Sequence, residues 1–368
     1  QKVHTSAQEC PDGRRRLRSA AWPSHRPREL RNAPMKIEPV AAALVLLCLS
    51  CAPAGEEPSD ASAAEEAALP ADLQTRVAAR LDALDAISTL YAKHLPSGRE
   101  IAVRADRPMN TLSVIKIPVM VQAFLDDRSG RLDLDRRYVV EADDLRRGSG
   151  LIQTFEPGLN PTLRGLVMQM IITSDNTATD MVIEAVGLDR VNALLASEGY
   201  AETRLRMTTG DLFREVWVRA DPAHASLSHR EVFERGFPSD PQAGALTFAF
   251  EGDSTVWLGR STAREMGRLL EQILEAEIAD REASDEMVGM LRRQLYSSRL
   301  PQRVRWHGVG VAHKTGDWPP IAGNDVGILF YEGGPTVVAV FTNQNTGDFF
   351  ELEATLGLIA QDIVEAWR

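Results

Sequence analysis

Residues 113–116 read Ser-Val-Ile-Lys, and two more short strings follow along the 368-residue chain, Ser174-Asp175-Asn176 and Lys314-Thr315-Gly316. A serine hydroxyl is a weak nucleophile, so it needs a base, a second proton carrier and donors for an oxyanion. Alone, each string is as typical of an ordinary helix start, helix cap or strand end. In this order, the three strings together indicate one active site around Ser113.

Lys116 is the predicted base. The apolar spacing from Ser113 to about residue 127 is helical, so Ser113 and Lys116 would share one face at the helix start. A desolvated lysine beside another cation loses its proton readily. The chain has only five lysines, and two of the three beyond residue 70 lie in these strings. Arginine in practice keeps its proton, so lysine at these positions of an arginine-rich chain indicates proton transfer.

The other two strings supply the remaining groups. Ser174 would relay a proton to the leaving nitrogen, while Asp175 would brace its loop. Lys314 would hold a substrate carboxylate, and the N–H groups of Ser113 and Asp317 would form an oxyanion hole, each donor contributing about 2.7–4 kcal/mol. We predict catalytic roles for Ser113, Lys116, Ser174 and Lys314, and substrate contacts for Asn176, Thr315, Gly316 and Asp317.

Working outward, the apolar periodicity predicts helices at both ends of the folded region, over 71–86 and 351–368. The expected strands also come from both ends: 87–95, 99–105, 304–315, 325–331 and 336–343. The middle, 106–299, is mostly helical. This pattern predicts an α+β fold in three α/β/α layers, with an antiparallel five-stranded sheet built from both chain ends and an inserted all-helical lobe.

With these motifs, the chain resembles the class A β-lactamase-like serine hydrolases of the β-lactamase/DD-peptidase superfamily over roughly residues 73–368. The resemblance extends to residues 98–101, 161–164, 172–179, 261–266 and 324–327. It implies the fold, an acyl-enzyme mechanism and a location in the cell envelope. The substrate expected on this basis is a β-lactam or a D-Ala-D-Ala-like small molecule.

One feature of that family is missing. Class A enzymes carry a Glu-x-x-Leu-Asn segment between the second and third motifs, whose glutamate activates the deacylating water. The matching stretch, residues 203–210, contains no glutamate, and Glu156 lies in a similar segment that precedes Ser174. Residues 211–256 form a longer connection than usual, in which Glu215, Glu231 or Glu234 could substitute.

The leading hypothesis is therefore an exported serine hydrolase that opens β-lactam rings through an acyl-Ser113 intermediate. The alternatives are a DD-peptidase or esterase-like penicillin-binding protein, a slowly deacylating β-lactam sensor, and a structural lipoprotein with an idle serine.

The N-terminal region predicts export. Met35 is the expected start, with residues 1–34 an upstream over-call or a basic disordered tail, and 35–54 has the apolar run of a signal peptide. Cleavage would leave Cys51 for lipid attachment or occur after Ala54, and 55–70 reads as a disordered tether. We expect a periplasmic or envelope location. All three cysteines lie upstream of the fold, so we expect no disulfide in it.

Composition narrows the partners. The formal net charge is −11, and no basic stripe follows residue 70, which argues against nucleic acid. The seven histidines show no metal-binding spacing, so we expect neither metal nor cofactor, and a monomer. Trp318, close to Gly316, is a candidate for lining the site.

Overall fold

The computed structural model describes residues 72–238 and 243–368. The predicted signal peptide, lipid attachment site and tether lie outside these residues. Within them, no helix is both long and apolar enough to cross a membrane.

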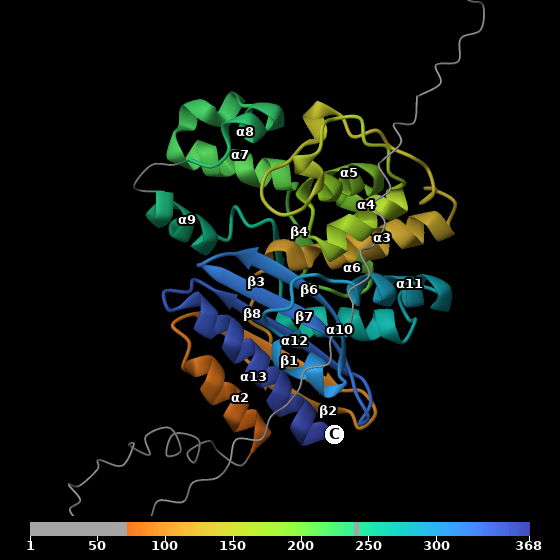
Figure 1. Cartoon of the computed structure of the whole chain (residues 1–368), viewed down its shortest axis with the longest axis vertical. Coiled ribbons are helices and arrows are strands. Elements are labelled where there is room, and N and C mark those ends of the chain that lie inside the picture. Colours follow the sequence, from red (N-terminus) through yellow and green to blue (C-terminus); the bar gives the residue numbers. More distant parts are fainter. Residues whose placement is uncertain (1–71, 239–242) are drawn as a thin grey trace, which may run out of the picture. The chain divides into compact units, whose positions relative to one another are not determined.

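One antiparallel sheet joins the two ends of the described chain (Figure 1). Its strands, in spatial order, are β2 (Arg99–Val103), β1 (Ile87–His94), β8 (Thr336–Asn343), β7 (Ala322–Phe330) and β6 (Gly310–Trp318). β1 pairs with β8, so the N-terminal hairpin is continued directly by the C-terminal strands. The predicted fold class and five-stranded sheet are confirmed.

Helices cover both faces of this sheet. Val338 and Val340 of β8 point into a core closed by α2 (Leu73–Asp82), α12 (Pro301–Val304) and α13 (Phe349–Trp367). Val337, Ala339 and Phe341 point to the opposite core, where α10 (Ala263–Leu274) packs against β1, β7 and β8. Alternate residues of one strand thus enter two cores, as expected of a strand buried on both faces.

The inserted lobe lies between β2 and β6 in sequence and is mainly helical. Its helices are α3 (Lys116–Arg128), α4 (Leu163–Ile172), α5 (Asn176–Val186), α6 (Leu188–Ser197), α7 (Thr209–Ala220), α8 (His229–Arg235), α9 (Ala243–Gly252), α10 and α11 (Arg281–Leu291). A small sheet, in the order β3 (Met109–Asn110), β5 (Gly259–Ser261) and β4 (Arg204–Leu205), lies within it. The long connection predicted after residue 210 folds as α7, α8 and α9, drawn in green in Figure 1.

Several predicted boundaries differ from those of the structure, and two of them concern the motifs. The strand expected over 304–315 begins only at Gly310, because Pro301 starts a short helix, in which its missing N–H costs nothing at the first position. The strand continues to Trp318, so Lys314 to Gly316 lie inside it rather than at its end. The helix expected from Ser113 begins as a 3₁₀ turn, η1 (Leu112–Ile115), and α3 starts at Lys116. Pro118 has no N–H to donate to Val114, so an α-helical ladder cannot start earlier.

Candidate active site

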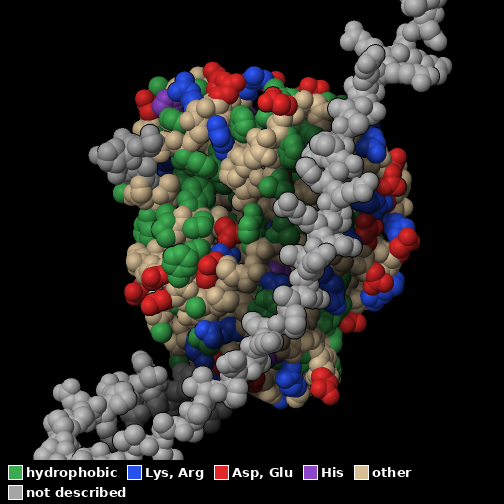
Figure 2. Space-filling view, in the orientation of Figure 1, with side chains coloured by type: hydrophobic (Ala, Val, Ile, Leu, Met, Phe, Trp, Pro, Cys, Tyr) green, Lys and Arg blue, Asp and Glu red, His purple; other side chains and the backbone are tan. Residues whose placement is uncertain are grey.

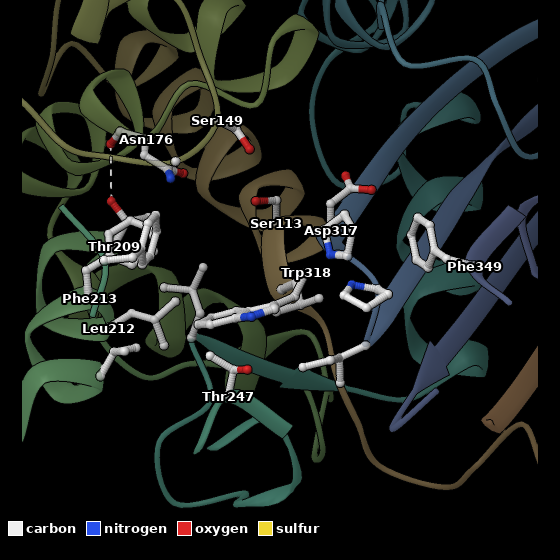
Figure 3. Close-up of a pocket in the computed structure, with 18 of the residues that line it drawn as sticks. Ser113, Ser149, Asn176, Thr209, Leu212, Phe213, Thr247, Asp317, Trp318 and Phe349 are labelled. Atoms are coloured by element: carbon white, nitrogen blue, oxygen red, sulfur yellow. Dashed lines mark hydrogen bonds between the residues drawn. The ribbon is translucent and has the colours of Figure 1, made fainter. Parts of the chain in front are cut away.

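Ser113 lies in the tight η1 turn between the small sheet and α3. Leu112, just before it, has φ +47°, a left-handed conformation that is uncommon for a non-glycine residue and typical of functional turns. The Leu112 N–H donates to Asn110 Oδ1 (3.2 Å), and the Val114 N–H donates to the Thr111 carbonyl (3.0 Å). The backbone N–H groups of Leu112 and Val114, on either side of Ser113, therefore form hydrogen bonds within the turn. Ser113 projects its hydroxyl into a cavity (Figure 3).

Lys116 is fully buried one turn further along and faces the Ser174 loop. Its Nζ donates to the Ser174 carbonyl (2.7 Å) and to Asn176 Oδ1 (2.8 Å), and it lies 3.2 Å from Ser174 Oγ. Burial, together with the nearby charge of Lys314, holds the pKa of Lys116 well below its ordinary value. A neutral Lys116 amine has two N–H bonds, which the Ser174 carbonyl and Asn176 Oδ1 would accept, so its lone pair would remain free to accept a proton.

Ser174 occupies a loop between α4 and α5 and also has a positive φ, +55°. Asp175 braces this loop by accepting hydrogen bonds from the N–H groups of Ile152 (2.8 Å) and Ala178 (2.9 Å). The Ser174 hydroxyl thereby lies between two amines, because Lys314 Nζ donates to it from the opposite side (3.0 Å). This arrangement forms a short path for protons between Lys116 and Lys314.

Lys314 projects from β6 and is also fully buried. Its amine donates to the Thr315 carbonyl (2.7 Å) as well as to Ser174 Oγ. Burial lowers its pKa to about 8, although the carboxylates of Asp317 and Asp325 oppose that shift. Lys314 therefore stays mostly protonated at neutral pH.

The substrate-contact residues predicted from the sequence have different surroundings. Asn176 lines the cavity, but its amide is already engaged, since Nδ2 donates to the Arg147 carbonyl (2.8 Å). The Thr315 hydroxyl is buried and has no hydrogen-bond partner within the described residues. Gly316 lies against the nucleophile turn: a Cβ there would be 2.5 Å from the Thr111 carbonyl oxygen. Asp317 lines the cavity and forms an ion pair with Arg299.

The cavity has a volume of about 630 Å³ and opens beside Ser113. Its walls come from η1, α7, α9, the end of β6 with the loop after it, and the start of α13 (Figure 3). Trp318, a candidate from the sequence, is among the lining residues, whereas Lys116, Ser174 and Lys314 are not. The two lysines and Ser174 are thus buried next to the cavity without lining it, and Asn176, which accepts from Lys116, lines it.

The three glutamates considered for deacylation do not line this cavity. Glu231 caps the start of α8 through the Ser228 N–H (2.8 Å), and Glu234 pairs with Arg230 on the same exposed helix. Among the described lining residues, the carboxylates are those of Asp317 and Glu353, and both contact the buried Arg299. The geometry thus gives no support to Glu215, Glu231 or Glu234 as the water-activating base.

Sequence reasoning missed Arg299, Glu353 and the α7 side chains Leu212 and Phe213. Arg299 and Glu353 belong to no recognisable sequence motif. Their ion pair joins a segment that precedes β6 in the chain to α13, which follows β8. The helical spacing of Leu212, Phe213 and Val216 could have indicated an apolar helix face, though not what it faces. The described residues contain no cluster of three or more side chains suited to a metal.

Comparison with protein families gives one match: the model of the beta-lactamase enzyme family matches residues 72–367. No curated protein sequence matches the chain.

Solved structures of similar fold cover four fifths of the chain. A β-lactamase from Sphaerobacter thermophilus has a TM-score of 0.64 at 26% identity, covering 80% of this chain and 96% of its own. An ancestral class A β-lactamase (GNCA) has a TM-score of 0.63 at 21% identity, and the match covers 80% of this chain and 100% of the ancestral one. An acyl-enzyme complex of a PBP-A mutant with penicillin G has a TM-score of 0.61 at 21% identity, and the match covers 80% of this chain and 95% of the PBP-A chain. At their identities, the last two are evidence for the fold alone.

Proposed function

The chain belongs to the beta-lactamase enzyme family, and from this premise we propose that it is an exported serine hydrolase that opens β-lactam rings through an ester on Ser113. The observation that carries the proposal is the meeting of two buried lysines on the Ser174 hydroxyl, beside a cavity into which Ser113 projects.

In the proposed acylation, the Ser113 hydroxyl gives its proton to the neutral amine of Lys116 while Oγ bonds to the lactam carbonyl carbon. The N–H groups of Ser113 and Asp317 stabilise the oxyanion. When the carbon–nitrogen bond breaks, the nitrogen takes the proton of Ser174. Lys116 then returns a proton to Ser174 across the 3.2 Å contact. Lys314 keeps the site positive and attracts the substrate carboxylate.

A second candidate is a penicillin-binding protein or sensor of the same fold that releases its acyl group slowly. It is favoured by the carboxylates of the cavity, since Asp317 and Glu353 are both engaged with Arg299. Because Arg299 already binds both carboxylates, neither is left free to orient a deacylating water.

Intact-protein mass, followed together with absorbance after mixing with a chromogenic cephalosporin, separates the two candidates. An adduct that disappears while colour keeps growing supports a β-lactamase, and a stoichiometric adduct that persists supports the penicillin-binding protein. Ser113→Ala should form no adduct, whereas Ser149→Ala, which removes another hydroxyl of the cavity wall, should still form one. A Ser113→Ala variant that retains full activity would refute both candidates.

We further propose that the protein is anchored in the envelope through a lipid on Cys51. The mass of the mature N-terminus tests this point, because cleavage after Ala54 would instead leave a free Gly55.

A further inference from the structure

The cavity beside Ser113 is walled mainly by apolar side chains. Leu212, Phe213 and Val216 of α7 form one wall, Leu246 of α9 another, and Trp318 and Ile321 a third. In Figure 3 the Trp318 ring lies across the space next to Ser113, opposite Leu212. Figure 2 shows hydrophobic side chains gathered on the same face, over α9 and beside the sheet.

The charged groups of the cavity pair with one another and leave a formal charge of −1. Among its described lining residues, Arg299 is the only cation, and its guanidinium contacts the carboxylates of both Asp317 and Glu353 (3.1 Å for Glu353). The same guanidinium also donates to the Asn324 carbonyl (2.9 Å). No cation of these walls is left to hold an anionic substituent, so the cavity suits an uncharged group.

The position of the proton path decides which part of a substrate enters the cavity. The leaving atom must lie near Ser174 Oγ, which is held between the two lysines. Ser174 and Lys314 are not part of the cavity wall, whereas Ser113 and Asp317 are. The substituent carried on the acyl side of the carbonyl therefore faces the cavity, while the nitrogen released from the carbonyl lies toward Ser174.

We propose that this cavity is a specificity pocket for the acyl part of the substrate, and that it selects acyl donors with a bulky, uncharged apolar group, an aryl or medium-length alkyl chain. The inference rests on the proposed acylation of Ser113. Cavities that take whole drug-sized ligands measure about 300–1,000 Å³. A volume of about 630 Å³ would be left largely empty by a methyl side chain such as that of D-alanine.

A series of 6-acylamidopenicillanic acids with acetyl, hexanoyl and octanoyl side chains tests the proposal, because these probes share one β-lactam and differ only in methylenes. The second-order rate constant of acylation is measured by intact mass. Burial of a methylene is worth about 0.8 kcal/mol, so we expect the rate to rise about two- to fourfold per methylene until the cavity is filled. Equal rates across the series would overturn the proposal.

Variants on one helix supply the matched control. Leu246→Gln puts a polar group in the wall and should reduce the hexanoyl-to-acetyl rate ratio at least about threefold. Ala249→Gln, on the exposed side of α9, should leave the ratio unchanged. Val216→Thr, which keeps the shape of the side chain, repeats the test from α7, and unchanged melting temperatures show that the variants fold.

The outcomes separate the two proposals. Adducts on Ser113 whose rates ignore the side chain would refute the specificity pocket alone. No adduct with any member of the series would refute the acylation of Ser113, and the pocket with it. A rate ratio that Leu246→Gln and Val216→Thr both leave intact would show that the apolar group binds elsewhere.

Discussion

Two buried amines, those of Lys116 and Lys314, converge on the Ser174 hydroxyl in this protein, and their surroundings differ. Lys116 donates to two oxygens that can only accept, the Ser174 carbonyl and Asn176 Oδ1. The adjacent charge of Lys314 adds to the effect of burial on the pKa of Lys116. Asp317 and Asp325 partly offset burial at Lys314. A buried lysine whose pKa is lowered by burial and by a neighbouring cation can act as a base, and the neighbouring lysine can act as its electrostatic partner.

Exchanging each lysine for arginine tests this division of roles. Lys116→Arg leaves a permanent cation in place of the base, so acylation by a β-lactam should slow about 10²- to 10⁴-fold. Lys93→Arg is the matched control, because Lys93 lies on β1 in an ion pair with Glu271 (2.7 Å) away from the cavity. Intact-mass kinetics measure both. Rapid acylation of Lys116→Arg would exclude this lysine as the base.

The pH dependence of binding should report Lys314. Its pKa of about 8 means that it is charged below that pH and loses its proton as the pH rises through it. KM for a carboxylate-bearing β-lactam should therefore rise above about pH 8, by up to about tenfold per pH unit. An uncharged ester provides the comparison, since its KM should lack this alkaline rise. A flat KM for the β-lactam between about pH 6 and pH 10 would contradict the assignment.

At the scale of elements, β6 and β7 hold the turn that carries Ser113 in place. Asn324 of β7 donates through Nδ2 to the carbonyls of Asn110 (2.9 Å) and Thr111 (3.2 Å). Gly316 of β6 faces the same Thr111 carbonyl with no room for a side chain. The residues just before the left-handed Leu112, the first residue of η1, are thus held by two strands of the large sheet, which compensates for its strain.

Two glycine substitutions test this arrangement. Gly316→Ala would place Cβ 2.5 Å from the Thr111 oxygen, so we expect a loss of about 1–3 kcal/mol in stability and slower acylation. Gly289→Ala, inside α11, has nothing within 4 Å of the new Cβ and should raise stability by up to about 1 kcal/mol. Urea unfolding measures both free energies. A Gly316→Ala variant as stable and active as the original protein would show that the turn can move.

At the scale of the whole molecule, β8, the last strand of the chain, connects the two hydrophobic cores on either face of the sheet. β8 pairs with β1 on one side and β7 on the other, and its side chains enter both cores. The fold therefore depends on contacts between segments more than 200 residues apart, such as Leu90 with Val340. Such long-range pairing makes the sheet cooperative rather than locally stable.

Two phenylalanines near the C-terminus test this view. Phe341 of β8 is completely buried, whereas Phe350 at the start of α13 is 79% exposed. Phe341→Ala should cost about 3–5 kcal/mol in the free energy of unfolding, and Phe350→Ala no more than about 0.5 kcal/mol. Chemical denaturation followed by circular dichroism measures both. Similar losses in the two variants would contradict the central place of β8.

The sequence predicts an element accurately where a regular apolar pattern extends over the whole of it. The strand predicted over 336–343 has the bounds of β8, because its apolar pattern extends over the whole element. The segment 304–309 was misjudged, since a short apolar run before a strand does not distinguish a helical turn from the strand itself. The predicted start of α3 at Ser113 is too early because apolar spacing does not register the N–H that Pro118 lacks.

The sequence by itself determined which chemical groups the site contains, because the three motifs place a serine, a second serine and two rare lysines in a recognisable order. It also determined the layers of the fold through the spacing of apolar residues. Only the tertiary structure decided that Lys116 and Lys314, which lie 58 and 140 residues from Ser174, meet at its hydroxyl. It alone placed α7 and α9 around an apolar cavity and paired Arg299 with Asp317 and Glu353. Periodicity reports which face of an element is buried, whereas the partner of a buried group depends on packing between distant segments.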